Sequence, residues 1–213
     1  MEDVVLMSDP RVAAVPTLGL PDPLVDAARL LPIDDRKSDA AGAWRLLRQP
    51  VLERLADAAA GLPADLRLVV VEGYRPPALQ KTYFDSYTRR LRGERPDLAD
   101  HEVRHLASRH VSPPEVAPHS AGAAVDVLLT TPEGIELDLG SAINATPEES
   151  GGRCYTRHPD VTGEPFLLRQ TLGAALEGAG LVNYPTEWWH WSYGDRYWAL
   201  ATGRQHALYD AIH

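Results

Sequence analysis

Two short apolar segments, both rich in valine, limit the folds open to this chain. Residues Leu66–Glu72 read LRLVVVE, and residues Ala123–Leu129 read AAVDVLL. Each segment is shorter than a typical helix and carries β-branched residues, so each predicts a buried strand. The prolines of the GYRPP sequence that begins at Gly73 end the first strand. We therefore expect a core built around a sheet.

Other segments carry the periodicity of helices or of further strands. Apolar residues three or four positions apart predict helices. Pro50 is expected to break, kink or restart the first predicted helix, Ala40–Leu62. A turn at Thr130–Gly134 predicts a hairpin, which makes part of the sheet antiparallel. The pattern favours an α+β fold, a central mostly antiparallel sheet flanked by helices. The expected elements are helices at Ala40–Leu62, Ala78–Arg92, Asp97–His110 and Glu164–Gly180, a third strand at Ile135–Leu139, and a last strand region at Leu181–Tyr193.

Length and composition indicate an ordinary globular protein. The 213 residues suggest one domain, with an irregular, proline-containing segment over residues 1–38 packed on it. The net charge of −9 argues against a nucleic-acid partner, which needs a basic surface. Cys154 is the single cysteine, so no intrachain disulfide is possible. Without a secretory signal or a long apolar stretch, we expect a cytoplasmic protein with no membrane partner. The oligomeric state stays open.

Four polar residues in two motifs point to a metal centre. His119 and Asp126 lie in the sequence HSAGAAVD, and Glu187 and His190 lie in EWWHW. Two imidazoles and one carboxylate supply the three protein ligands typical of a catalytic zinc site, which keeps one position open for water. Glu187 remains as a base that can take a proton from that water. The alternative is a pair of buried structural histidines and a hydrogen-bonded carboxylate.

The spacing of these residues demands bends in the chain. His119 and Asp126 are seven positions apart, so in one regular strand they would face opposite sides of the sheet. Gly122 gives the freedom for a bend between them. Glu187 and His190, three positions apart, also need a turn to share a cavity. An ionised Asp126 inside an apolar strand is costly unless it is paired or binds a metal.

A second possible zinc motif lies at His101–His105, which reads HEVRH. On a helix, His101 and His105 share a face and could hold zinc beside Glu102. The segment is charged on nearly all sides and Arg104 would lie beside the metal, so we expect a solvated helix instead. Arg75, at the end of the first strand, could donate hydrogen bonds to a developing oxyanion or be an ordinary surface residue.

Taken together, the motifs resemble a family of bacterial zinc peptidases, the VanX-type D-alanyl-D-alanine dipeptidases. The resemblance rests on GYRP at Gly73–Pro76, on HSAGAAVD at His119–Asp126, on LDLG at Leu137–Gly140 and on EWWHW at Glu187–Trp191. The wider group includes D,D-carboxypeptidases and peptidoglycan L,D-endopeptidases. The resemblance implies a zinc D,D-peptidase fold of the hedgehog-like type and one zinc ion per chain. It implies His119, Asp126 and His190 as ligands, Glu187 as base and Arg75 as the residue that stabilises the transition state.

The expected reaction is hydrolysis of the amide bond of D-alanyl-D-alanine or a closely related dipeptide. Tyr74, Ser120 and Asn144 are the expected substrate-binding residues; Asn144 stands where the family has an aspartate for the substrate ammonium. Glu148 and Glu149 could supply that charge instead. One alternative is a D,D-carboxypeptidase or another hydrolase of longer peptides. Another is a non-enzymatic zinc-binding module, but the presence of Glu187 as a base argues against it.

Overall fold

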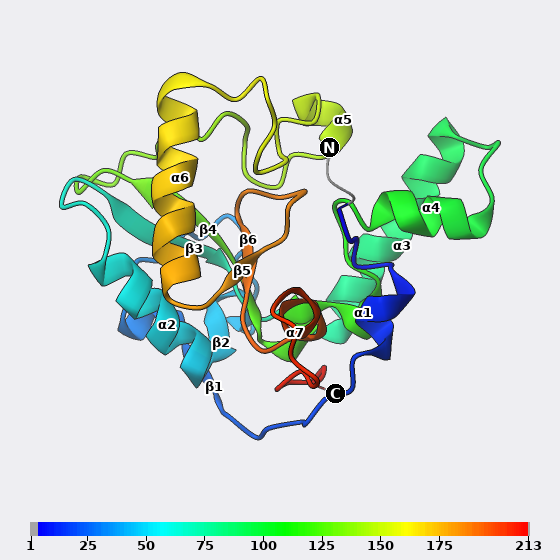
Figure 1. Cartoon of the computed structure of the whole chain (residues 1–213), viewed down its shortest axis with the longest axis horizontal. Helices are drawn as coiled ribbons and strands as arrows, with labels where there is room; N and C mark the ends of the chain where they lie inside the picture. Colours follow the sequence, from blue (N-terminus) through cyan, green and yellow to red (C-terminus); the bar gives the residue numbers. More distant parts are fainter. Residues whose placement is uncertain (1–3, 213) are drawn as a thin grey trace.

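The computed structural model describes residues 4–212, which form an antiparallel sheet of four strands with helices around it (Figure 1). The strands are β3 (Arg67–Glu72), β4 (Ala124–Thr130), β5 (Val182–Asn183) and β6 (His190–Ser192). They lie in the order β3-β4-β6-β5, and every neighbouring pair is antiparallel. The α+β prediction is confirmed, and so are the two valine-rich strands.

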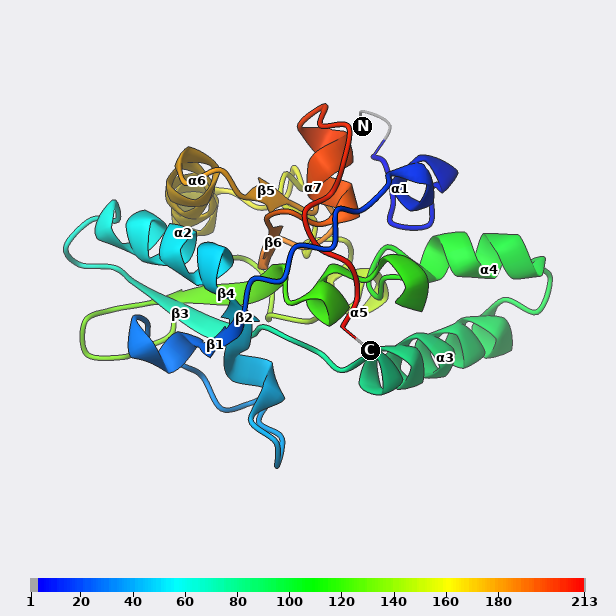
Figure 2. The same cartoon turned by 90° about the horizontal axis from the view of Figure 1, so that it is seen from below.

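Two helices cover one face of the sheet and form the main core with it. Helix α2 (Gln49–Ala60) and helix α6 (Gly163–Gly178) pack against each other on the same side (Figures 1 and 2). Apolar side chains from both helices and from β3 and β4 interlock there, and burial of this surface is the main stabilising contribution to folding. Fully or nearly fully buried members of this core include Leu52, Leu55, Val70, Val127, Leu129, Leu172, Leu176 and Trp189.

Helices α3 (Pro77–Glu94) and α4 (Asp100–Ala107) form a hairpin that projects from one end of the molecule (Figure 2). Both were expected from the sequence. They are held together by an apolar cluster separate from the main core. The buried members of this α3–α4 cluster are Tyr87, Leu91, Val103, Ala107 and Val111.

The remaining elements are short. Helix α1 (Pro10–Ala14) contacts helix α7 (Arg196–Ala201), so segments from the two halves of the chain lie side by side there (Figure 1). No helix within residues 4–212 has the length and apolar character needed to cross a membrane. The other short elements are strands β1 (Leu24–Asp26) and β2 (Leu46–Arg48), helix α5 (Pro147–Ser150), and the 3-10 helices η1 (Ala27–Arg29), η2 (Ala43–Arg45), η3 (Pro114–Val116) and η4 (Pro118–Ala121).

The first predicted helix, Ala40–Leu62, is wrong over its N-terminal half. That half contains η2 and strand β2, which pairs with β1, and α2 begins only at Gln49. Pro50 accounts for the boundary. A proline lacks the backbone N–H that a helix interior needs, and it is tolerated in the first turn, where Pro50 lies.

Two strand predictions also need correction. After the expected turn, the segment Ile135–Leu139 forms a single bridge, between Glu136 and Thr130, and no strand. Ile135 is 65% exposed whereas Leu139 enters the core, so the segment leaves the sheet instead of extending it. The last strand region splits into β5 and β6, because residues 184–189 form tight turns between them.

Candidate metal centre

Three side-chain atoms converge at one end of the sheet. His119 Nε2 lies 3.1 Å from His190 Nδ1 and 3.3 Å from Asp126 Oδ1, and His190 Nδ1 lies 3.1 Å from Asp126 Oδ1. All three residues are buried. In a tetrahedral site with metal–ligand bonds of about 2.0–2.1 Å, ligand atoms stand about 3.3 Å apart. The triangle therefore has the size of one face of a zinc coordination tetrahedron.

The register of the sheet brings two of these residues together. Asp126 on β4 is paired directly with His190 on β6, so their side chains lie on the same face. On the other side of Asp126, a bulge in β3 between Val70 and Glu72 shifts the register by one residue and brings Glu72 opposite Asp126. Three polar side chains thus form a row across neighbouring strands.

His119 reaches the row from outside the sheet. It belongs to η4, and Gly122 ends that helix with φ 67°, a left-handed conformation that favours glycine. A Cβ at position 122 would also collide with the Leu24 side chain. The bend that the spacing of His119 and Asp126 requires is therefore present, and a larger residue than glycine would disturb it.

The hydrogen bonds of His119 determine which of its nitrogens faces the cluster. Nδ1 lies 2.6 Å from the carbonyl oxygen of Gly73, which can only accept, so the proton of the neutral ring belongs on Nδ1. Nε2 then presents its lone pair to the Asp126 carboxylate. Electron-rich atoms at this distance repel one another unless a cation or a proton lies among them. The donor set fits zinc, with the backbone carbonyl orienting the imidazole.

The charges at the cluster are strongly coupled. Burial alone would raise the pKa of Asp126, yet the adjacent His119 and His190 hold that pKa well below its usual range. Burial disfavours the charged form of His190, but the hydrogen bond with Asp126 outweighs it and raises the His190 pKa. Asp126 is therefore an anion ready to bind a cation.

Glu187 lies beside the cluster but outside the triangle. Its Oε2 is 3.8 Å from His190 Nδ1, and its Oε1 is 3.3 Å from Nδ1 of His110. The expected turn between Glu187 and His190 is present, closed by a hydrogen bond from His190 N to the Glu187 carbonyl. Glu187 is thus a buried carboxylate within reach of whatever occupies the cluster.

Arg75 is held firmly next to the same row. It donates two hydrogen bonds of 2.7 Å, from Nε and Nη2, to the Glu72 carboxylate, and a third from Nη1 to Gln80 Oε1. Both charged side chains are buried, and Lys37 Nζ lies 4.0 Å from Glu72. Burial would raise the Glu72 pKa, but Arg75 holds it below its usual range. Arg75 is therefore not a surface residue, and its remaining N–H groups are pre-oriented.

The three expected substrate-binding residues lie in different settings, and their role stays a prediction. Tyr74 is half-buried and its backbone N–H donates to Leu46 O. Ser120 is fully buried and its hydroxyl donates to the carbonyl of Arg75. Asn144 is half-buried, with a left-handed backbone (φ 60°).

Both candidate substitutes for the missing aspartate are engaged elsewhere. Glu148 accepts hydrogen bonds from Tyr87 and Arg109, and Glu149 caps α5 by accepting one from the backbone of Thr146. Both carboxylates therefore already have protein partners in this arrangement.

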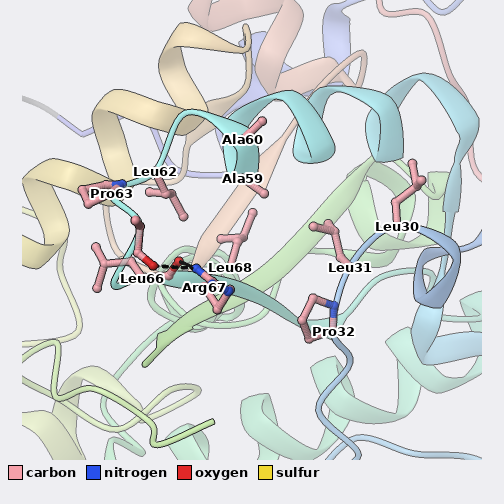
Figure 3. Close-up of a pocket in the computed structure, with 11 residues that line it drawn as sticks. Leu30, Leu31, Pro32, Ala59, Ala60, Leu62, Pro63, Leu66, Arg67 and Leu68 are labelled. Atoms are coloured by element: carbon pink, nitrogen blue, oxygen red, sulfur yellow. Dashed lines mark hydrogen bonds between the residues drawn. The ribbon is translucent and has the colours of Figure 1, made fainter. Parts of the chain in front are cut away.

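The HEVRH segment and a surface groove lie apart from the cluster. His101 and His105 are exposed on α4, and neither belongs to the metal-binding group found within residues 4–212. A groove of about 500 Å³ opens between the end of α2, the start of β3 and Leu30–Pro32 (Figure 3). None of the cluster residues lines that groove.

Sequence reasoning missed three residues of this region. Glu72 and Gln80 bind Arg75, and His110 lies beside Glu187. Glu72 carried a signal, because a carboxylate in a valine-rich strand needs a partner. His110 carried none, since its position depends on the packing of α3 and α4.

Known proteins are similar to this chain in sequence. The family model described as D-ala-D-ala dipeptidase matches residues 36–209. A D-alanyl-D-alanine dipeptidase of Synechocystis sp. is 31% identical over 189 residues, which cover 78% of this chain and 76% of that protein. The D-alanyl-D-alanine dipeptidase of Escherichia coli is 35% identical over 72 residues, 34% of this chain and 35% of that protein.

Among solved structures the likeness is remote. The LdcB LD-carboxypeptidase aligns with 86% of this chain and 72% of its own, at 21% identity and a TM-score of 0.39. A zinc complex of the vancomycin-resistance D,D-pentapeptidase VanY aligns with 81% of this chain and 90% of its own, at 17% identity and a TM-score of 0.35. The family match and the Synechocystis relative establish the assignment: the chain belongs to the D-ala-D-ala dipeptidase family and is a peptidase.

Proposed function

We propose that this protein is a zinc-dependent dipeptidase that hydrolyses D-alanyl-D-alanine or a closely related dipeptide. The observation that carries the proposal is the triangle of His119 Nε2, Asp126 Oδ1 and His190 Nδ1, with the Glu187 carboxylate beside it. The relatives named as D-alanyl-D-alanine dipeptidases support the substrate.

The three triangle residues would hold one zinc ion per chain. When bound there, zinc lowers the pKa of a water molecule and polarises the scissile carbonyl. Asp126 supplies one negative charge, so the site with two neutral imidazoles keeps a net positive charge when it is loaded. That charge favours an attacking hydroxide and a developing oxyanion.

Glu187 acts as the general base and then as the general acid. Its Oε2 faces the cluster and takes the proton of the attacking water. The same carboxyl group returns a proton to the leaving amine. Because Glu187 is not one of the three triangle residues, it can carry this proton while all three metal ligands keep their places.

Arg75 stabilises the charge that develops on the carbonyl oxygen. Its guanidinium is fixed by Glu72 and Gln80, and two of its N–H groups remain for the substrate. A donor fixed before the reaction needs no reorganisation in the transition state. Asn144 would accept a hydrogen bond from the substrate ammonium, without the charge of an aspartate.

Metal analysis and a substrate screen test the proposal together. Wild type should bind one zinc ion, His190→Ala should lose it, and the control His101→Ala should keep it. If His101→Ala lost its zinc and His190→Ala kept it, the zinc site would lie at the HEVRH segment instead.

Zinc-loaded wild type should hydrolyse D-alanyl-D-alanine in preference to L,D- and L,L-dipeptides. Glu187→Gln should retain zinc and lose about 10²–10⁴-fold in turnover, as removal of a general base typically does. Turnover of longer D,D-peptides alone would indicate a carboxypeptidase instead.

A further inference from the structure

The catalytic carboxylate of Glu187 has two polar neighbours, one for each oxygen. Oε2 lies 3.8 Å from His190 Nδ1, a proposed ligand atom, and Oε1 lies 3.3 Å from Nδ1 of His110. His110 follows α4 directly, with its backbone N–H donating to the carbonyl of Ala107. Glu187 and His110 therefore meet where the segment after α4 lies beside the turn between β5 and β6, as the hydrogen bond from the Tyr184 hydroxyl to the Ser108 carbonyl also shows.

We propose that His110 is a positioning residue that holds Oε1 of Glu187, so that Oε2 faces the metal ligands and carries the proton. This inference rests on the proposed function of Glu187 as base. No part of it requires His110 to touch the substrate.

Burial makes the contact between these two side chains significant. The side chains are only 16% and 9% exposed, so water gives the facing atoms little competition. Nδ1 of His110 is buried and makes no hydrogen bond within residues 4–212. A buried N–H without a partner typically costs about 1–3 kcal/mol, and Glu187 Oε1 is near enough to remove that cost. A small rotation of the ring would align the pair, and such contacts often tighten only when substrate binds.

The His110 ring is itself held in place. The Tyr87 ring packs edge-on against it, with centroids 5.2 Å apart and an interplanar angle of 64°. Tyr87 is fixed in turn, because its hydroxyl donates to Glu148 Oε2 over 2.9 Å while Arg109 donates to Oε1. A packed chain of contacts thus connects α3 and α5 to the base.

The backbone of Glu187 is well fixed, but its carboxylate is not. The Glu187 N–H donates to Tyr184 O, and the Glu187 carbonyl accepts from His190 N and from the Asn183 amide. The side chain makes no hydrogen bond within residues 4–212, and its polar contacts are those with His110 Nδ1 at Oε1 and His190 Nδ1 at Oε2, so His110 is the contact that can fix Oε1. A base that is misplaced by a fraction of an ångström transfers protons poorly, which is why supporting contacts matter for turnover.

Kinetics of His110 variants test the proposal. His110→Ala should lower kcat about 10–100-fold, the usual effect of removing a supporting contact, with KM and zinc content nearly unchanged. His110→Asn should recover much of the rate, because its amide nitrogen can take the place of Nδ1. His101→Ala, on the exposed face of α4, is the matched control and should match wild type. A change in KM alone, or equal rates for His110→Ala and wild type, would overturn the proposal.

A double-mutant cycle separates positioning from a general structural effect. In a Glu187→Gln background, His110→Ala should cost little further activity, because the group that it positions is already disabled. A full additional loss in that background would show that His110 acts on something other than Glu187.

A spectroscopic measurement tests the contact without using activity. In the zinc-free protein, the imidazole ¹⁵N resonance of His110 Nδ1 should shift in Glu187→Gln and stay unchanged in Glu133→Gln, an exposed control. If wild type hydrolysed no dipeptide but the resonance shifted, the proposed function would fail and the contact would stand. No shift would exclude the contact whatever the enzyme does.

Discussion

Replacement of Glu72 by glutamine measures how much the buried ion pair between Glu72 and Arg75 contributes to stability. Glu72 and Arg75 share two hydrogen bonds of 2.7 Å, and their side chains are 3% and 9% exposed. The amide of glutamine keeps the shape of the side chain and removes its charge. Arg75 cannot lose its own charge, because a guanidinium stays protonated. The substitution therefore leaves an uncompensated cation in the interior.

The expected loss follows from the burial of both partners. Removing one member of a buried pair typically destabilises a protein by about 3–5 kcal/mol. At about 2–4 °C per kcal/mol for a chain of this size, Tm should fall by about 6–20 °C. Lys37 Nζ lies 4.0 Å from the Glu72 carboxylate and also loses its negatively charged partner, so we expect a fall in Tm in the upper part of this range. The negative charge of Asp126 also stabilises the charged form of Arg75, which makes the expected loss smaller.

Urea unfolding of the zinc-free protein gives the free energy directly. Glu136→Gln is the control, because it breaks an exposed ion pair with Arg36 that should contribute about 1 kcal/mol or less. The double variant Glu72→Leu/Arg75→Met should recover most of the stability, since apolar replacement of both partners is often neutral. Two results would contradict this account. In one, Glu72→Gln loses no more unfolding free energy than Glu136→Gln; in the other, the double variant is less stable than Glu72→Gln.

Further predictions concern catalysis, recognition and pH. Arg75→Ala should lower kcat more than it raises KM in steady-state kinetics, as loss of a transition-state contact does; a rise in KM alone would assign Arg75 to ground-state binding. Asn144→Asp should raise the preference for D-alanyl-D-alanine over its N-acetyl form about tenfold, or 1.4 kcal/mol; an unchanged ratio of kcat/KM would place the ammonium elsewhere. Burial raises the Glu148 pKa, but Tyr87 and Arg109 hold it below its usual range. This stabilisation is present above the usual pKa and disappears as the pH falls through the lowered one. Thermal unfolding should therefore show Glu148→Gln less stable than wild type at neutral pH and equal to it in acid, and a gap that persists in acid would contradict the assignment.

The parts of the fold that the sequence predicted are those with local causes. The strands around Val70 and Val127 followed from short valine-rich segments, and the bend at Gly122 followed from the spacing of His119 and Asp126. Each of these features depends on a few adjacent residues.

The features that were missed depend on contacts between distant segments. Strand β2 exists because β1 lies beside it, and the periodicity of its residues looked helical. Glu72 lies opposite Asp126 because of a bulge in β3, and sequence patterns do not reveal such a bulge. His110 meets Glu187 only through tertiary packing, although the two are far apart in the chain.

The separate apolar cluster of α3 and α4 has a consequence for how the protein responds to heat. A unit with its own small core can open while the rest of the molecule stays folded. Opening would withdraw Tyr87 and His110 from Glu187, while the three triangle residues, carried by η4, β4 and β6, stay together. Warming would then cause a reversible loss of turnover below the main melting transition, without metal release. Amide hydrogens of residues 77–107 would exchange with solvent sooner than those of β4.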